Sequence, residues 1–167
     1  SDNFVKAVNY LLSEEPDKAL EVFLNYPDID EYTVETFHLL GNLFRDRGEV
    51  DRALRVHQNV IARSNLNTTQ KQKAMFALGQ DFFAAGMLDR AESVFLELRE
   101  SNSKTISKTS ICESLRTIYE QTQEWEKAIE ATECCLRDVK KGSEVKSNSM
   151  NLNSLISHYY CELADEY

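Results

Sequence analysis

The sequence has few residues that break helices, with only two prolines and five glycines among 167 residues. Their scarcity favours long helices and argues against a β-rich fold with many turns. Long apolar runs are also missing, since no stretch approaches the ~20 residues that a membrane-spanning helix needs. A signal peptide is absent as well. The chain lacks an initial methionine and ends within a helical pattern, so we expect it to be a fragment of a longer protein.

Positive charge is scarce, because 19 lysines and arginines face 28 acidic residues and give a net charge of −9. Nucleic acids and anionic membrane surfaces both require a basic patch, so neither is the expected main partner. Hydrophobic residues make up 42% of the chain and charged residues 28%, which is typical of a soluble globular domain.

The four cysteines are Cys112, Cys134, Cys135 and Cys161. None belongs to a C-x-x-C pair, and disulfide-stabilised domains are much richer in cysteine. We therefore expect reduced thiols on helices, which suits a cytosolic compartment.

Motifs of catalysis are missing. The sequence contains no P-loop, no G-x-S-x-G, no H-E-x-x-H and no G-x-G-x-x-G, and we predict that the chain is not an enzyme. The histidines lack metal-site spacing, and the single pair of His158 with Cys161 is too little for a zinc site. His57 takes the place of an aromatic in the repeat described next, so we interpret it as a core residue rather than a ligand or base.

An internal repeat is present. "LGNLF" (residues 40–44) recurs as "LGQDF" (residues 78–82), and each is followed by a second glycine and then by "DRA". The same interval of 12 residues precedes four alanines, in the pairs Ala7–Ala19, Gly41–Ala53, Gly79–Ala91 and Arg116–Ala128. This is the tetratricopeptide pattern, in which two antiparallel helices form each unit.

The pattern predicts an all-α solenoid of helix hairpins, a right-handed superhelix with about four repeats and the first helix of a fifth. Residues 1–167 form a single array, with units at about 1–31, 34–66, 72–102 and 109–141 and a partial unit at 149–167. We expect helices near 2–12, 16–25, 32–47, 50–62, 68–85, 88–100, 105–122, 125–139 and 149–166, and polar connections at 65–69 and 140–149.

The spacing has a physical cause, since residues three and four apart share one helix face. Phe37, Leu40, Gly41 and Phe44 form such a core stripe, and the glycine allows the second helix to approach closely. Tyr160, Leu163, Ala164 and Tyr167 are the equivalent stripe of the partial unit. Gly48 and Gly86 are expected to end helices in the left-handed conformation, and Pro16 is expected to begin one. Arg116 replaces the small residue in the fourth unit, where it should widen the helix crossing or lie along its edge.

Four stretches in this order and with these linkers closely resemble the lipopolysaccharide assembly protein B family: "LGNLFRDRGEVDRALRVHQ", "LGQDFFAAGMLDRAESVF", "IYEQTQEWEKAIEA" and "HYYCELA". The resemblance covers nearly the whole chain and implies the N-terminal repeat part of the cytoplasmic region. It also implies an inner-membrane protein of Gram-negative bacteria, with an N-terminal anchor and a C-terminal rubredoxin-like metal-binding domain, neither of which lies in this sequence. We expect no cofactor or metal in this chain.

The function that the resemblance implies is that of an adaptor at the cytoplasmic face of the inner membrane. Such an adaptor promotes degradation of the lipid A deacetylase by a membrane ATP-dependent protease and so limits lipopolysaccharide synthesis. Its partners would be these two proteins and other lipopolysaccharide assembly proteins. The alternatives are a peptide-binding scaffold with a different client and an intramolecular platform for the protein's own metal-binding domain.

The first helices of stacked repeats line a concave groove, and the residues beside each core stripe are our candidates for partner binding. Phe76 and Phe83 lie two turns apart and are suited to anchor a bound peptide, or else to pack against neighbouring helices. The candidates are His38, Asn42, Arg45, Asp46, Lys73, Phe76, Gln80, Phe83, Glu113, Thr117 and Glu120.

Overall fold

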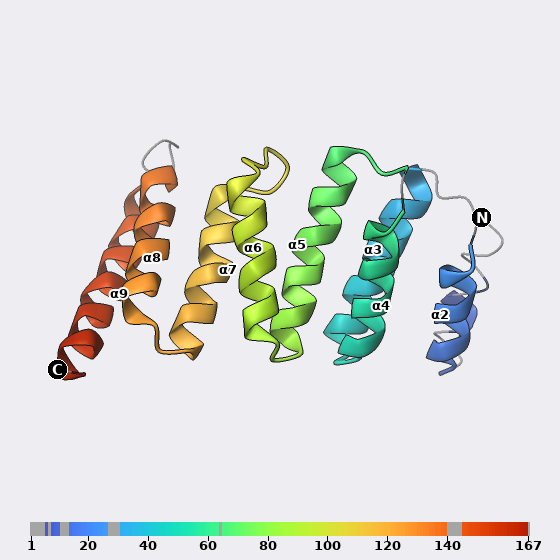
Figure 1. The fold of residues 1–167 in the computed structure, drawn as a ribbon, viewed down its shortest axis with the longest axis horizontal. Helices are drawn as coiled ribbons and strands as arrows, with labels where there is room; N and C mark the ends of the chain where they lie inside the picture. The colour runs from blue at the N-terminus through green and yellow to red at the C-terminus, as the bar shows by residue number, and fades with distance from the viewer. Residues whose placement is uncertain are drawn as a thin grey trace. The chain divides into compact units, whose positions relative to one another are not determined.

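The computed structural model describes residues 6, 8–10, 14–26, 31–63, 65–139 and 145–166. These residues form α-helices joined by turns and short loops, which confirms the predicted all-α class. Figure 1 labels the helices, which are α2 (Pro16–Leu24), α3 (Glu31–Asp46), α4 (Val50–Ile61), α5 (Thr68–Ala84), α6 (Leu88–Glu100), α7 (Lys108–Gln121), α8 (Trp125–Val139) and α9 (Val145–Asp165).

The helices belong to two compact units, Ser1–Met87 and Leu88–Tyr167. In the first unit, α4 packs against α2, α3 and α5, and α3 also contacts α5. In the second unit, α7 packs against α6 and α8, and α8 packs against α9. Each unit therefore contains one complete hairpin of a first and a second helix, α3–α4 and α7–α8, together with a helix that follows it.

The core of the first unit is built from the repeat positions that the sequence predicts. Phe37, Leu40, Phe44 and Ala53 are buried. Phe37 also packs edge-on against Phe23 of α2, with ring centroids 5.1 Å apart. A fully buried side chain of this size contributes roughly 1.5–3 kcal/mol through the area it removes from water. The stripe therefore holds α3 against α4 and α2.

The second unit uses the same positions with different residues. Leu115, Tyr119 and Ala128 are buried, and the tyrosine hydroxyl donates a 2.9 Å hydrogen bond to Glu92 of α6. Burial and this bond raise the Tyr119 pKa. The position of Phe37 is held by Cys112, which is also buried.

Cys112 and Cys134 form a disulfide that links α7 to α8, with Cα atoms 6.3 Å apart. The expectation of four reduced thiols is therefore wrong for this pair. Periodicity placed the two residues on different helices and could not reveal that they face each other. Cys135 and Cys161 are free thiols, the first buried and the second exposed.

The turns between paired helices share one left-handed residue. Gly48 and Gly86 have φ angles of 79° and 73°, as the sequence predicts. Glu14 and Gln123 have φ angles of 61° and 58°, although a side chain disfavours this conformation. Each of the four residues lies five positions before the alanine that ends the 12-residue interval of its repeat. The regular spacing of the repeats therefore extends to backbone conformation.

Most predicted helix boundaries agree with the structure within one or two residues, and Pro16 is the first residue of α2. Two starts differ. The helix predicted from 105 begins at Lys108, because the Ser107 hydroxyl caps it by accepting from the Ser110 amide at 3.0 Å. The last helix begins at Val145 rather than 149, which shortens the predicted loop. The helix predicted at 2–12 lies mostly outside the described residues, of which 6 and 8–10 are helical.

The predicted core stripe of the partial unit is wrong in detail. Tyr160 is 55% exposed, whereas its neighbour Tyr159 is buried. Ala164 is exposed as well, and Tyr167 lies outside the described residues. The reason is that α9 buries the face that meets α8, while the face that would receive a second helix has no partner among the described residues.

Candidate functional site

The groove candidates of the first unit lie along α3 and α5, which contact each other. Two ion pairs connect these helices. Lys73 Nζ lies 2.8 Å from Glu35 Oε1 at an exposed position, and Arg45 Nη1 lies 2.8 Å from Asp81 Oδ1 at a nearly buried one. The candidates on α3 are His38, Asn42, Arg45 and Asp46, and those on α5 are Lys73, Phe76, Gln80 and Phe83.

The guanidinium of Arg45 is directed into this interface, where its side chain is only 17% exposed. Besides Asp81, it donates to Asn42 Oδ1 at 3.0 Å and to the Ala77 carbonyl oxygen at 3.3 Å. Its hydrogen-bonding capacity is therefore used largely within the chain, and the same is true of the Asn42 oxygen.

Asp81 is the centre of this buried network. Its side chain is fully buried, and its second carboxylate oxygen accepts a hydrogen bond from Nδ1 of His57. Sequence reasoning missed Asp81, although an aspartate in a stripe with Ala74 and Ala77 is itself a signal that a buried partner exists.

His57 is fully buried, which confirms that it is a core residue. It fits because a glycine faces it: a Cβ added to Gly41 would come within 2.5 Å of His57 Nε2. The predicted close approach at Gly41 therefore makes room for an imidazole ring. Nε2 itself has no hydrogen-bond partner among the described residues.

His38 lies beside this ring, with centroids 5.5 Å apart. Its Nδ1 is buried without a hydrogen-bond partner in the described part of the chain. Burial, and after it the positive charge that His57 can carry, lower the His38 pKa. His38 is therefore a neutral, half-buried side chain at the edge of the candidate face.

Three other candidates of the first unit are available for external contacts. Asp46 is exposed, Gln80 and Phe83 are half-buried, and none of their side chains makes a hydrogen bond or ion pair with another described residue. Phe76 is half-buried and already has a contact within the chain. Phe83 therefore offers an apolar contact to a partner, and Asp46 and Gln80 offer polar contacts.

The candidates of the second unit lie on α7. Glu113 is exposed, and the Thr117 hydroxyl donates to the Glu113 carbonyl oxygen at 2.9 Å. Glu120 accepts from Arg116 Nη1 at 2.6 Å and from the hydroxyl of Tyr159. Burial, followed by the bond to Glu120, raises the Tyr159 pKa. Glu120 is thus hydrogen-bonded to Tyr159 of α9. Glu113 is the candidate on α7 whose charge has no ion-pair partner among the described residues.

Arg116, which was expected either to widen the helix crossing or to lie along its edge, takes part in this arrangement. Its side chain is 20% exposed, and Nη1 also lies 3.3 Å from the Tyr159 hydroxyl. On α8 the position equivalent to His57 is Thr132, which is small and buried and donates its hydroxyl hydrogen to the Ala128 carbonyl oxygen at 2.7 Å.

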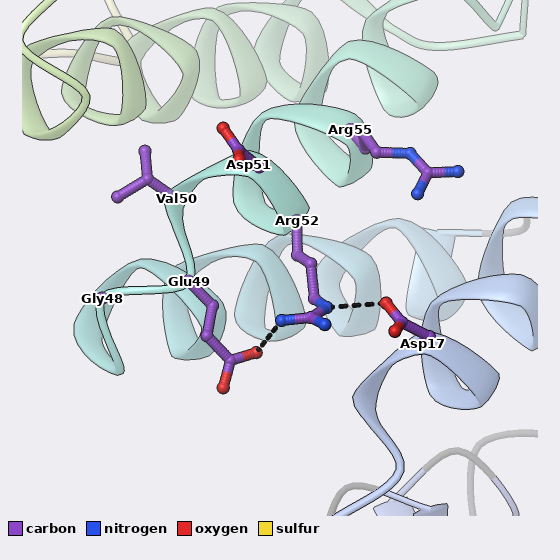
Figure 2. Close-up of a pocket in the computed structure, with 7 residues that line it drawn as sticks. All are labelled: Asp17, Gly48, Glu49, Val50, Asp51, Arg52 and Arg55. Carbon is purple, nitrogen blue, oxygen red and sulfur yellow. Dashed lines mark hydrogen bonds and ion pairs between the residues drawn. The ribbon is translucent and has the colours of Figure 1, made fainter.

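A surface pocket of about 290 Å³ lies in the first unit beside the turn from α3 to α4. Figure 2 shows Arg52 between two carboxylates, with Nε 2.9 Å from Asp17 Oδ1 and Nη1 3.1 Å from Glu49 Oε2. The hydrogen bond from Arg52 lowers the Asp17 pKa. Most of the charge is balanced inside the pocket, and none of the predicted candidates lines it. The lining residues are Asp17, Gly48, Glu49, Val50, Asp51, Arg52 and Arg55.

No helix among the described residues combines the length and apolarity required to cross a bilayer. In the same part of the chain, no group of three or more histidine, cysteine or acidic side chains is arranged to hold a metal ion.

The tetratricopeptide repeat family model matches residues 36–70. The nearly identical TPR-like repeats of a kinesin light chain from Podosopora anserina superpose with a TM-score of 0.68, at 14% identity over 98% of this chain and 86% of that one. A variant of that protein gives the same values. The chain therefore has the fold of a tetratricopeptide-repeat array, and one repeat matches the family model.

Its curated relatives are more specific. The chain is 42% identical to lipopolysaccharide assembly protein B of Escherichia coli K12 over 164 residues, which is 98% of this chain and 39% of the relative. It is 35% identical to lipopolysaccharide assembly protein B of Haemophilus influenzae over 170 residues. The chain is thus homologous to lipopolysaccharide assembly protein B, as its sequence motifs indicate, and spans about two fifths of the length of these relatives.

Proposed function

We propose that this chain is a non-enzymatic protein-interaction module of lipopolysaccharide assembly. In this role it acts as an adaptor that brings the lipid A deacetylase to a membrane ATP-dependent protease and so promotes its degradation. It would work at the cytoplasmic face of the inner membrane, held there by a part of the protein outside this sequence.

The observation that carries the proposal is the 42% identity to lipopolysaccharide assembly protein B over 98% of the chain. The repeat architecture supports it, since first helices of such arrays present an extended row of side chains to a partner. The net charge of −9 fits a protein partner better than a nucleic acid.

The candidate face supports an adaptor role through the side chains that the intrachain network leaves available. Phe83 offers an apolar anchor, and Gln80 and Asp46 offer polar contacts on the same unit. Glu113 supplies a charge on α7. Arg45 is less suitable as a test residue, because its replacement would leave Asp81 buried without its ion-pair partner and would destabilise the fold.

The experiment is a binding assay of the chain with purified deacetylase and with the protease, comparing Gln80→Lys with the matched variant Gln58→Lys. Gln80 lies on the candidate face of α5, and Gln58 is exposed on the second helix α4. A lysine at a desolvated contact should weaken binding about tenfold or more, whereas the same change on α4 should leave it unchanged.

A second matched pair is Glu113→Lys on α7 and Glu130→Lys on α8, both at exposed positions. Circular dichroism first verifies that all four variants are folded. Equal binding by both members of each pair would move the contact away from the candidate face. Failure of the unchanged chain to bind either protein would assign recognition to another part of the protein and refute the proposal for this segment.

A further inference from the structure

Helix α3 has an exposed apolar stripe that lies outside the predicted groove. Tyr32, Leu39 and Leu43 are 85%, 66% and 45% exposed. With Thr36 between them, they are spaced four, three and four residues apart, so they follow one line along the helix. Among the described residues, five large hydrophobic side chains are exposed, and three of them belong to this stripe.

The other first helices carry no exposed large apolar side chain at the equivalent positions. On α5 they are the half-buried Gln70 and the residues Ala74, Ala77 and Asp81, which are small or charged and fully buried. On α7, Ile111 and Ile118 are buried as well. Only on α3 are these positions both large and exposed, and a contiguous apolar patch of this kind is the usual mark of an interaction surface.

The charge beside the stripe determines which occupant fits. Glu31, Glu35 and Asp46 lie along one edge of it and are exposed. Glu35 is paired with Lys73, but Glu31 and Asp46 form no ion pair with any described residue. The other edge offers only Arg47, whose guanidinium lies 3.0 Å from Glu49. The stripe is therefore bordered by uncompensated negative charge.

This border disfavours two of the possible occupants. In an antiparallel pair of α3 helices from two copies, Glu31 and Glu35 of one copy would face Asp46 of the other. In a parallel pair, each acidic residue would face itself. An anionic bilayer would also be repelled. A helix with lysine or arginine beside its own apolar stripe gains from the same charges.

We infer that the α3 stripe is a second interaction surface that binds a basic amphipathic helix of a partner protein. The leucines and Tyr32 would form the apolar contact, in the manner of a helix that docks by residues three and four apart. Glu31 and Asp46 would select the basic edge and accelerate association. The apolar residues of this surface are separate from the proposed groove, and Asp46 borders both.

The probe is a labelled peptide of about three heptads with leucine at the first and fourth positions and lysine beside them. Its binding to the chain is measured by fluorescence anisotropy. We expect Leu39→Ser and Tyr32→Ser each to weaken binding about tenfold, and Tyr160→Ser, an exposed tyrosine on α9, to have no effect. All of these side chains are exposed, so folding should be preserved.

The charge is tested by Asp46→Lys against Glu100→Lys, which are exposed last residues of α3 and α6. The first change should weaken binding about threefold and reduce its dependence on salt, while the second should do neither. A peptide with glutamate in place of lysine should bind at least about tenfold more weakly. Gln80→Lys should leave peptide binding unchanged, which separates this surface from the groove.

Several results would overturn the inference. Equal binding by the Leu39→Ser and Tyr160→Ser variants would remove the stripe from the contact. Self-association of the unchanged chain that is lost in Leu39→Ser would show that the stripe binds a second copy. Sedimentation of the unchanged chain, but not of Leu39→Ser, with phosphatidylglycerol vesicles would show that the stripe binds a membrane. Peptide binding only after removal of residues 1–13 would assign it to the chain's own first residues.

Discussion

The hairpins α3–α4 and α7–α8 have equivalent repeat positions 75 residues apart. At one pair of these positions, the helix that carries the larger side chain differs between the two hairpins. In the first, Gly41 is the small partner and His57 the large one. In the second, Arg116 is the large partner and Thr132 the small one. Both His57 and Thr132 are fully buried. The same two repeat positions thus carry one small and one large residue in each hairpin, and the larger residue is on the first helix in one hairpin and on the second helix in the other.

The two hairpins also differ in how they bond to the following first helix. Arg45 and Glu120 hold equivalent positions with opposite charge. Arg45 pairs with buried Asp81 on α5, whereas Glu120 accepts from Tyr159 on α9. The comparison teaches that this position of the repeat, which sequence reasoning assigned to partner binding, is used in both units to join consecutive repeats.

The largest expected effect is at Asp81. Asp81→Ala leaves buried His57 without an acceptor and Arg45 without its ion-pair partner, so the free energy of unfolding should fall by roughly 3–5 kcal/mol. Urea denaturation followed by circular dichroism measures it. Asp89→Ala, at an exposed position on α6, is the control. A loss below about 1 kcal/mol would show that the network contributes little.

The next effect concerns the covalent link that only the α7–α8 hairpin possesses. The disulfide joins residues 22 apart, and closing a loop of that size stabilises by about 3 kcal/mol in the chain-entropy model. Dithiothreitol should therefore lower the stability of the second unit. The Cys134→Ser variant should be insensitive to the reductant, and Cys161→Ser should respond like the unchanged chain. Equal stability with and without reductant in the unchanged chain would contradict this.

A smaller effect is expected at the Gly41 crossing. Gly41→Ala places a methyl group against the His57 ring, and overpacking of this kind costs about 1–3 kcal/mol. A double-mutant cycle with His57→Ala tests the cause, since the alanine at 41 should cost at least about 1 kcal/mol less when the ring is absent. Additive effects would mean that the two residues do not compete for space.

The smallest effect comes from the turns. Gln123 has a φ angle of 58° where Gly48 has 79°, and an L-residue costs about 1 kcal/mol in this conformation. Gln123→Gly should therefore stabilise the second unit by about 1 kcal/mol, and Gly48→Gln should destabilise the first by a similar amount. Thermal denaturation measures both. Effects of the same sign would refute the equivalence of the two turns.

The repeat pattern predicted the hairpins well because local rules act there. Helix ends at Gly48 and Gly86 and the buried stripe through Phe37 and Phe44 follow from residue type and from the period of 3.6 residues. The candidate site was predicted less completely. His57 was recognised as a core residue, but its partner Asp81 is 24 residues away, and no local rule connects them.

The sequence by itself determined the class of fold, the spacing of the hairpins and the residues of the first-unit core, because these depend on periodicity along a single chain. The tertiary structure alone decided which polar side chains are used internally, which cysteines are paired and which apolar stripe stays exposed. Those features depend on the approach of side chains from different helices, where a change of a few ångströms separates a buried ion pair from a surface available to a partner.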